Sequence, residues 1–430
     1  MKINIKRLLS IASVVFIVGI APTLTVDAQS LPTPKRLTPI SSNLTYIQTN
    51  TVDGKIFQRS LQSESTLWRN VSFPSGYTPI SAVTVAKNLP KDTKSNATFV
   101  LQGVIAKDKA TNINHIFRRT FVKEYNYWSP WIIDTKINVA SDSKLEIVYR
   151  KFTNASSMFI TIVRDEKNDL QAQYSSEDGV LWSDPYLAGQ NAIGDFSVFH
   201  ATSDTTSRDF DTTFITYVNA SNTLTTVYSR SIISWVKFND SLESDTKNIK
   251  TVVLNNPIIS SGFGGEQKLA DKLMPLQVRR GSDNYLYYRA LNCYTRNSEC
   301  TFSTWQSTGD RTQDDFSLIK LDGQINRFLV SLKGMDNNGY TSIYEARIES
   351  SSNFDLKYIS GELTGKVDSN IVTDNYTAKN GKAIFQTVIR GGKIQSRVLN
   401  VSVDGSIIFE GAKWITNGRA KSLAISGINL

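Results

Sequence analysis

Apolar and polar residues alternate with a period of two along most of this chain, and the alternating runs come in pairs. Within each pair, a short turn rich in Asp, Asn, Gly and Lys separates the two runs, a pattern that predicts a β-hairpin and not a helix. The pairs read LTYIQTNTVDGKIFQRSL, TFVLQGVIAKDKATNINHIFRRTF, MFITIVRDEKNDLQAQYS, TFITYVNASNTLTTVYSRS, LMPLQVRRGSDNYLYYRAL, RFLVSLKGMDNNGYTSIYEAR and AIFQTVIRGGKIQSRVLN. They begin near residues 44, 98, 158, 213, 273, 327 and 383, so the chain repeats about every 55 residues.

Two further elements accompany each hairpin. A third element follows it and carries a large aromatic residue: Trp68, Trp128, Trp182, Trp235, Trp305, Tyr358 and Phe409. A fourth apolar segment leads into the next hairpin, as in ISAVTVAK, KLEIVYRKF, DFSVFHAT and DFSLIKL. The repeats therefore predict an all-β fold, a seven-bladed β-propeller with four antiparallel strands per blade. Each blade must stack on its neighbours, because it cannot bury both of its faces alone.

The two ends of the repeat array predict how the ring closes. The first hairpin has no segment of the fourth type before it, whereas SLAISGINL, residues 422–430, follows the last repeat. We expect this C-terminal segment to pair with the first hairpin as the innermost strand of that blade. Residues 44–430 then form the propeller, and residues 29–43 precede it as an extended leader.

The N-terminus is typical of an export signal. A basic start containing Lys2, Lys6 and Arg7 precedes the apolar run LLSIASVVFIVGIA, and small residues follow. This arrangement predicts a secretory signal peptide over residues 1–28, cleaved after Ala28, because the run is short for a bilayer span. We therefore expect a secreted protein that has no transmembrane segment after cleavage.

The composition is that of an ordinary folded protein. The chain has 430 residues, of which 40% are hydrophobic and 20% charged, and this balance excludes a disordered or fibrous protein. The formal charge is +9, and it falls to +7 without the signal peptide. The basic residues are scattered, so we expect no binding of nucleic acid. We also expect a monomer. One role of this positive charge is simply to keep the surface hydrated. The alternative is that it attracts anionic polymers weakly.

The two cysteines, Cys293 and Cys300, lie in the stretch NCYTRNSECTF. Because an exported chain meets an oxidising compartment, we expect a disulfide between them. With His115 and His200 as the only histidines, we expect no metal site, and no motif indicates a cofactor.

One turn resembles a known repeat motif. SSEDGVLW resembles the Asp-box of sialidase-type repeats: Ser175, Gly179 and Trp182 match, and Glu177 stands where Asp is usual. A second copy, SVDGSIIF, matches at Ser402 and Asp404. The resemblance implies a structural turn and not a catalytic site. The regular spacing of the seven hairpins, together with the stretch YWSPWI, is also similar to that of PLL-type and fungal fucose-lectin propellers. This similarity extends over roughly residues 44–430.

Catalytic chemistry finds little support in the sequence. Glycoside hydrolysis needs two carboxylates about 5–9.5 Å apart, and pairs such as Asp209 with Asp211 or Asp314 with Asp315 are no more than any surface loop offers. The Arg-Ile-Pro motif of sialidases is absent. We therefore assign no catalytic residue, although a secreted sialidase-like hydrolase remains an alternative.

The aromatic residues beyond the repeated tryptophans are candidates for ligand binding. Trp131, Tyr186, Trp414 and Tyr77 are placed where a propeller binds ligands, and an aromatic ring can stack on the apolar face of a sugar. Packing in the core is their alternative role. We interpret the chain as a secreted, non-catalytic, lectin-like propeller whose partners are glycans or anionic cell-surface polymers. A protein-interaction scaffold on the cell surface is a further alternative.

Overall fold

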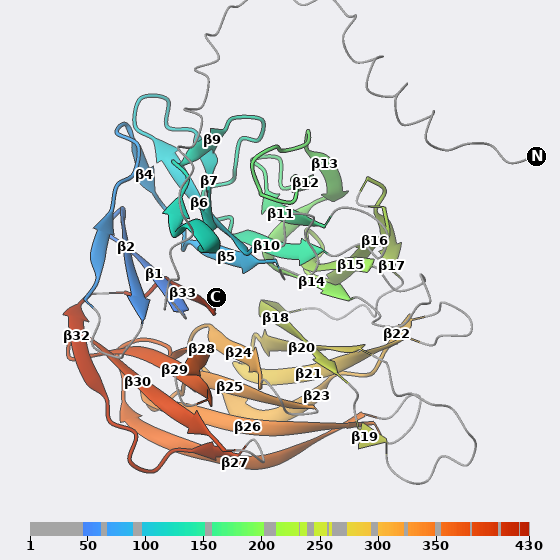
Figure 1. The fold of residues 1–430 in the computed structure, drawn as a ribbon. Helices are drawn as coiled ribbons and strands as arrows, with labels where there is room; N and C mark the ends of the chain where they lie inside the picture. The colour runs from blue at the N-terminus through green and yellow to red at the C-terminus, as the bar shows by residue number, and fades with distance from the viewer. Residues whose placement is uncertain are drawn as a thin grey trace, which may run out of the picture. The chain divides into compact units, whose positions relative to one another are not determined.

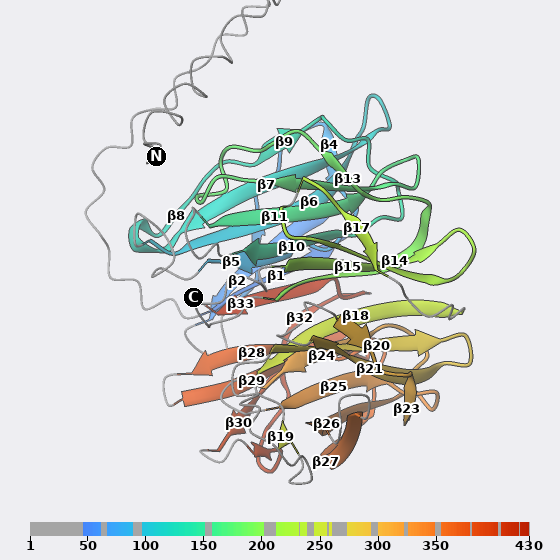
Figure 2. The same cartoon turned by 90° about the vertical axis from the view of Figure 1, so that its right-hand side faces the viewer.

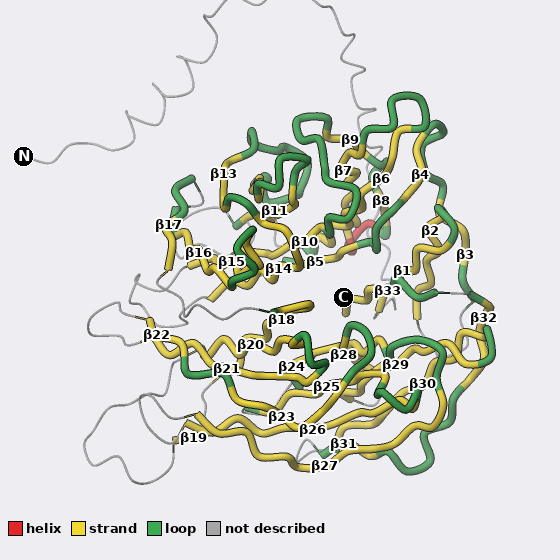
Figure 3. The backbone as a smooth tube through the Cα atoms, turned by 180° about the vertical axis from the view of Figure 1, so that it is seen from behind, coloured by secondary structure: helices red, strands yellow, loops and turns green. Residues whose placement is uncertain are grey.

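A computed structural model describes most of the chain after residue 45. The described residues are 46–61, 67–88, 97–150, 157–201, 212–231, 233–238, 245–255, 258–259, 273–293, 300–321, 326–348, 354–378, 381–402, 406–420 and 422–429. The predicted signal peptide and leader lie outside them. The described part is strand and loop apart from one 3-10 turn, η3 (Lys123–Tyr125), as Figure 3 shows. None of its segments forms a helix with the length and hydrophobicity that a membrane crossing requires.

The strands form seven sheets around a common centre, which we number as blades 1 to 7 (Figure 1). From the centre outward, blade 1 holds β33 (Ile425–Asn429), β1 (Tyr46–Val52), β2 (Lys55–Leu61) and β3 (Arg69–Val71). Blade 2 holds β4 (Tyr77–Pro79) and β5 (Thr84–Lys87), then β6 (Phe99–Asp108), β7 (Asn114–Val122), and β8 (Tyr127–Trp128) with β9 (Ile132–Asp134). Blade 3 holds β10 (Leu145–Arg150), β11 (Met158–Arg164), β12 (Leu170–Tyr174) and β13 (Tyr186–Gly189).

The other four blades follow the same plan. Blade 4 holds β14 (Ala192–Ala201), β15 (Thr212–Asn219), β16 (Leu224–Ser229) and β17 (Val236–Phe238). Blade 5 holds β18 (Thr246–Asn255), β20 (Leu273–Gly281), β21 (Tyr285–Cys293), and β22 (Cys300–Phe302) with β23 (Gln306–Arg311). Blade 6 holds β24 (Phe316–Lys320), β25 (Arg327–Lys333), β26 (Asn338–Ile348) and β27 (Phe354–Lys366). Blade 7 holds β28 (Val372–Ala378), β29 (Gly381–Arg390), β30 (Lys393–Val401), and β31 (Ile407–Ile408) with β32 (Ile415–Arg419).

The seven-bladed propeller predicted from the repeats is therefore confirmed, with departures in detail. Blades 2, 5 and 7 divide an inner or outer strand position between two short strands, and one further strand lies outside the plan. A short strand, β19 (Ile258–Ile259), pairs in parallel with β26 of blade 6. It lies in the connection between β18 and β20 of blade 5. The alternation of apolar and polar residues predicts antiparallel hairpins. It does not predict a parallel pairing between a loop segment and the next blade.

Apolar side chains from adjacent sheets pack face to face. Between blades 2 and 3, for example, Leu101 and Ile105 pack with Leu145, Ile147 and Phe159. Blades 3 and 4 form a similar cluster, as do blades 5 and 6. Alternate positions of one strand thus serve two different interfaces, which explains why the strands are apolar on both faces.

The ring closes through the C-terminal strand, as predicted. β33 pairs antiparallel with β1, and Tyr46 lies opposite Asn429 while Asn50 lies opposite Ile425. Both views in Figures 1 and 2 place β33 beside β1. The innermost strands contact one another in the closed order β33, β5, β10, β14, β18, β24, β28 and again β33. The head and tail of the propeller therefore share one sheet.

The seam between blades 7 and 1 contains a carboxyl group without a cationic partner among the described residues. The Tyr46 hydroxyl donates to Asp374 Oδ2 at 2.7 Å. Gly427 makes room for this pair, since a Cβ at that position would stand 1.8 Å from the Tyr46 hydroxyl. Burial raises the pKa of Asp374 to about 6, although the hydrogen bond from Tyr46 opposes the rise.

We expect Asp374→Asn to stabilise the protein above pH 6 and to leave stability unchanged near pH 4. An acid whose pKa is raised on folding favours the folded state below its unfolded pKa of about 3.9, and that contribution is lost as pH rises through about 6. The gain at pH 7.5 should approach about 3 kcal/mol, measured by denaturant unfolding. Asp315→Asn, which removes an acid from the exposed ion pair with Lys250, is the control. Parallel stability curves for wild type and Asp374→Asn from pH 4 to 8 would contradict the prediction.

Candidate functional site between blades 2 and 3

A buried arginine recurs at one position of the hairpin in blades 1, 2, 5 and 7. It lies opposite a glutamine on the preceding strand, and its Nε donates to the glutamine Oε1 at 2.8–2.9 Å. Its guanidinium also lies 4.1–4.5 Å from the centroid of a tryptophan ring. The sets are Gln48–Arg59–Trp68, Gln102–Arg119–Trp128, Gln277–Arg289–Trp305 and Gln386–Arg397–Trp414.

Each of these pairs faces the preceding blade and bonds to it. Arg59 donates to Ser396 of blade 7, Arg119 to Gln58 of blade 1, and Arg397 to Glu362 of blade 6. Burial lowers the pKa of Arg59 to about 10 and that of Arg119 to about 9, so both stay protonated at neutral pH. The guanidinium groups therefore form a polar layer that links the sheets.

The interface between blades 2 and 3 reverses this arrangement. Blade 3 carries Thr161 and Gln173 at the paired positions, and it has no arginine there. Arg118 of blade 2 supplies the guanidinium instead: its Nη2 donates to Gln173 Oε1 at 2.6 Å and to Thr161 Oγ1 at 2.9 Å. Successive residues of a strand point to opposite faces. Arg118 therefore faces blade 3, while Arg119 faces blade 1.

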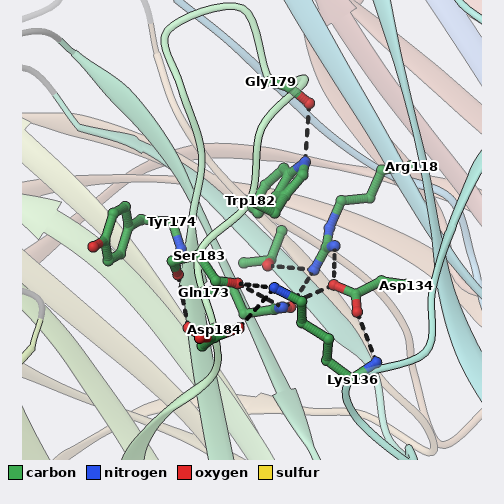
Figure 4. Close-up of polar contacts among 10 residues, drawn as sticks. Arg118, Asp134, Lys136, Gln173, Tyr174, Gly179, Trp182, Ser183 and Asp184 are labelled. Atoms are coloured by element: carbon green, nitrogen blue, oxygen red, sulfur yellow. Dashed lines mark hydrogen bonds and ion pairs between the residues drawn. The ribbon is translucent and has the colours of Figure 1, made fainter. Parts of the chain in front are cut away.

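A carboxylate joins Arg118 at this interface. Asp134 of β9 accepts from Arg118 Nη1 at 2.6 Å and from Gln173 Nε2 at 2.8 Å (Figure 4). Burial works to raise the pKa of Asp134. The charge and hydrogen bond of Arg118, together with hydrogen bonds from the Lys136 amide and Gln173, outweigh burial and hold that pKa below its usual range. At the exposed end of the network, Lys136 Nζ pairs with Asp184 Oδ1 at 2.8 Å. The network thus extends from the buried interface to the surface.

The turn at residues 175–182 positions Trp182 over Arg118. Asp178 Oδ1 accepts from the Val180 amide at 3.1 Å, and Gly179 adopts a φ of +73° that favours glycine. The Trp182 Nε1 then donates back to the Gly179 carbonyl at 2.9 Å. This fixed ring lies 3.9 Å from Arg118 Cζ.

A groove of about 250 Å³ opens over this network. Its apolar wall includes Ile132, Leu181 and the Trp182 ring, and its polar lining includes Asp134 and Lys136. Leu181 is 73% exposed and Ile132 is 45% exposed, so both offer apolar surface to a ligand. The groove therefore combines a rigid polar base with an apolar rim.

The predicted ligand residues do not converge on this groove. Trp131 lies on the other face of blade 2, where it contacts Phe73 edge-on, and Tyr77 packs edge-on against Phe117 in the same cluster. Tyr186 stacks on Tyr174. Trp414 lies over Arg390 and Arg397 in blade 7. Their role in binding stays a prediction.

Only some of the residues matched to the Asp-box hold a turn in the way the motif implies. Ser175 bridges to Trp182, and Gly179 and Trp182 hold the turn as described above. The acidic side chain that caps the turn is Asp178 and not Glu177, whose Oε1 is buried without a hydrogen-bond partner among the described residues. Ser402 donates to the Ser406 carbonyl, and Asp404 lies outside the described residues.

The two cysteines face each other in the backbone register. Cys293 of β21 lies directly opposite Cys300 of β22 in an antiparallel pair. The backbone arrangement is compatible with the predicted clip across a hairpin. The disulfide itself stays a prediction.

The groove holds few groups that could transfer a proton or bind a metal. Among its described lining residues Asp134 is the only carboxylate, and its bonds to Arg118 and Gln173 occupy it. No group of three or more metal-ligating side chains occurs among the described residues. The carboxylate pair Asp209 and Asp211 lies outside the described part of the chain.

Sequence reasoning missed Arg118, Asp134, Lys136 and Gln173. A signal for the recurring arginines was nevertheless present. Four of the seven hairpins carry a glutamine on the first strand and an arginine on the second, as in YIQTNTVDGKIFQR and FQTVIRGGKIQSR. The Arg118–Arg119 dipeptide departs from this pattern, because an extra arginine stands beside the recurring one.

Comparison with known proteins supports the fold. No protein-family model and no curated protein matches this sequence. Among solved structures, the BP39L lectin from Burkholderia pseudomallei matches with a TM-score of 0.56 and 11% identity over 87% of this chain and 95% of that chain.

Two other solved structures match less closely. A protein from Bacteroides uniformis that bears the name 6-phosphogluconolactonase has a TM-score of 0.49 and 11% identity over 90% of this chain and 100% of that chain. The lectin from Aleuria aurantia, in complex with α-methyl-L-fucoside, has a TM-score of 0.40 and 12% identity over 80% of this chain and 98% of that chain. Structural neighbours of this propeller thus include lectins, one of them solved with a bound fucoside.

Proposed function

We propose that the protein is an exported, non-catalytic β-propeller that binds carbohydrate, with the groove between blades 2 and 3 as a binding site. The observation that carries the proposal is the groove itself, where an apolar rim of Ile132, Leu181 and Trp182 borders a fixed polar network. A sugar presents an apolar C–H face and a polar edge, and this groove offers a surface for each. The likeness of the fold to that of the BP39L lectin is consistent with this function.

The network at the base favours binding over hydrolysis. A glycosidase needs a carboxylic acid that is protonated near neutral pH and a second carboxylate. The pKa of Asp134 lies below its usual range because Arg118 holds it ionised against the effect of burial. Fixed polar groups of this kind reduce the ordering cost of association, because they need no rearrangement when a ligand arrives.

A glycan array probed with the chain from residue 29 onward tests the proposal. We expect defined glycans to bind, and we expect the double variant Ile132→Ala/Leu181→Ala to bind them about tenfold more weakly, because two exposed apolar contacts are lost. Both side chains are exposed, so the variant should fold normally.

Leu187→Ala is the matched control, because Leu187 is 47% exposed on β13 and does not line the groove. Its binding should equal that of the wild type. An array without any bound glycan would exclude the carbohydrate function. Turnover of a fluorogenic glycoside would show that the protein is a hydrolase instead.

A further inference from the structure

A second cavity lies at the turns of the hairpins of blades 2 and 3. It has a volume of about 630 Å³, within the range typical of small-molecule sites. The turn of each hairpin contributes to it, through Asn112 in blade 2 and through Glu166 and Asn168 in blade 3. The connection between the two blades contributes Asp142. No residue is shared with the groove described above.

A buried amide lining this cavity has an unused acceptor. Asn114 is 5% exposed, and its Nδ2 donates to the Val139 carbonyl at 3.0 Å. Its Oδ1 is buried and has no hydrogen-bond partner within the described chain. A buried polar atom without a partner destabilises a protein, so a ligand group that donates to this acceptor would remove that cost.

The cavity wall is held rigid by Arg164. Its Nη1 donates to Asn168 Oδ1 at 2.8 Å, and its Nη2 pairs with Asp142 Oδ1 at 2.7 Å. Arg164 is itself 5% exposed, so this brace is anchored in the protein. The turn of blade 3 and the connection from blade 2 are therefore fixed relative to each other before any ligand arrives.

The lining offers charges of both signs and several amides. Glu166 and Lys107 line the cavity, and neither has an ion pair among the contacts of the described residues. Amide groups donate as well as accept, a carboxylate accepts, and an ammonium donates. Because Glu166 and Lys107 carry opposite charges, the cavity disfavours a ligand that is a simple anion or a simple cation. The complementary ligand has several groups that each donate and accept, which is the chemistry of vicinal hydroxyls.

From these observations we propose that this cavity, lined by Lys107, Asn114, Glu166 and Asn168, is a second binding site for a small polyhydroxylated molecule such as a monosaccharide unit. The choice of ligand class rests on the proposed carbohydrate-binding function. The location of the site rests on the cavity and the unused acceptor alone.

Saturation-transfer NMR with free D-glucose, D-galactose, D-mannose and L-fucose, together with the corresponding alditols, tests the proposal. We expect at least one of these probes to bind the wild type. The variants Glu166→Ala and Lys107→Ala should each weaken that binding by about tenfold, because each removes a charge-assisted hydrogen bond. Lys167→Ala, on the same turn but outside the lining, is the control and should bind as the wild type does.

The outcomes separate the two sites. Binding that survives Glu166→Ala and Lys107→Ala overturns the cavity proposal and leaves the groove unaffected. Loss of monosaccharide binding in these variants, with array binding unchanged by Ile132→Ala/Leu181→Ala, supports the cavity and excludes the groove. A wild type that binds none of the probes overturns the cavity proposal, and an array that is then still positive leaves the groove as the site.

Discussion

A chain that ends at Ala420 should be at least about 4 kcal/mol less stable than the full chain, a loss among the largest that local changes produce. The deletion removes β33, the innermost strand of blade 1, and exposes the edge of β1. It also removes the Ala424 carbonyl that accepts from Thr51, and the Ser426 hydroxyl, 2.9 Å from Thr49 Oγ1. Ile428, which packs against the buried cluster of Ile47, Val100 and Phe121, is lost as well.

Denaturant unfolding of the truncated and full chains measures this loss. Removal of Leu430 alone is the control, because β33 ends at Asn429 and stays intact. A synthetic peptide of residues 422–430 added in trans should restore part of the stability by adding a strand to the open edge. A truncated chain as stable as the full chain would show that the ring does not depend on this closure.

The fold followed from the sequence because its signals are local and repeated. A hairpin is specified by alternation on two strands and by its own turn, and all seven hairpins carry both features. The closing strand was predictable for a different reason. The first hairpin lacks an inner strand and the last repeat is followed by a spare one, so a count of segments was sufficient to pair them.

The candidate site was less predictable because it joins residues from separate hairpins. Arg118, Asp134 and Gln173 come from β7, β9 and β12, and only the stacking of two sheets brings them together. The sequence shows which strand face each residue occupies, but not which guanidinium crosses to the next blade. The aromatic residues chosen from the sequence, such as Trp131 and Trp414, were selected by type and by their place beyond the repeated tryptophans, and neither property distinguishes a packed ring from one that lines a groove.

Removing the guanidinium of Arg118 should destabilise the protein more than any other single change at this site. In Arg118→Met the volume is roughly kept, but Asp134, whose side chain is 9% exposed, loses its cationic partner. Breaking a buried ion pair from one side costs about 3–5 kcal/mol, because the remaining charge stays buried without compensation. Gln173 and Thr161 lose a donor at the same time.

The pH dependence distinguishes an electrostatic loss from a packing loss. In the wild type, Arg118 keeps the pKa of Asp134 low despite its burial, so the pair contributes stability above the unfolded pKa of about 3.9 and loses it as pH falls through the lower folded value. The gap between wild type and Arg118→Met should therefore be widest at neutral pH and should narrow below about pH 4. A gap that stays constant from pH 7 to pH 3 would assign the loss to packing.

Lys136→Met provides the comparison at the exposed end of the same network. Lys136 and Asp184 are 45% and 85% exposed, and such surface pairs contribute less than about 1 kcal/mol. Urea unfolding should therefore show a much larger loss in the free energy of unfolding for Arg118→Met, which breaks a buried ion pair, than for Lys136→Met, which breaks an exposed one. Equal effects of the two substitutions would mean that Arg118 does not anchor this interface. The proposed binding groove would then lack the rigid base on which the proposal depends.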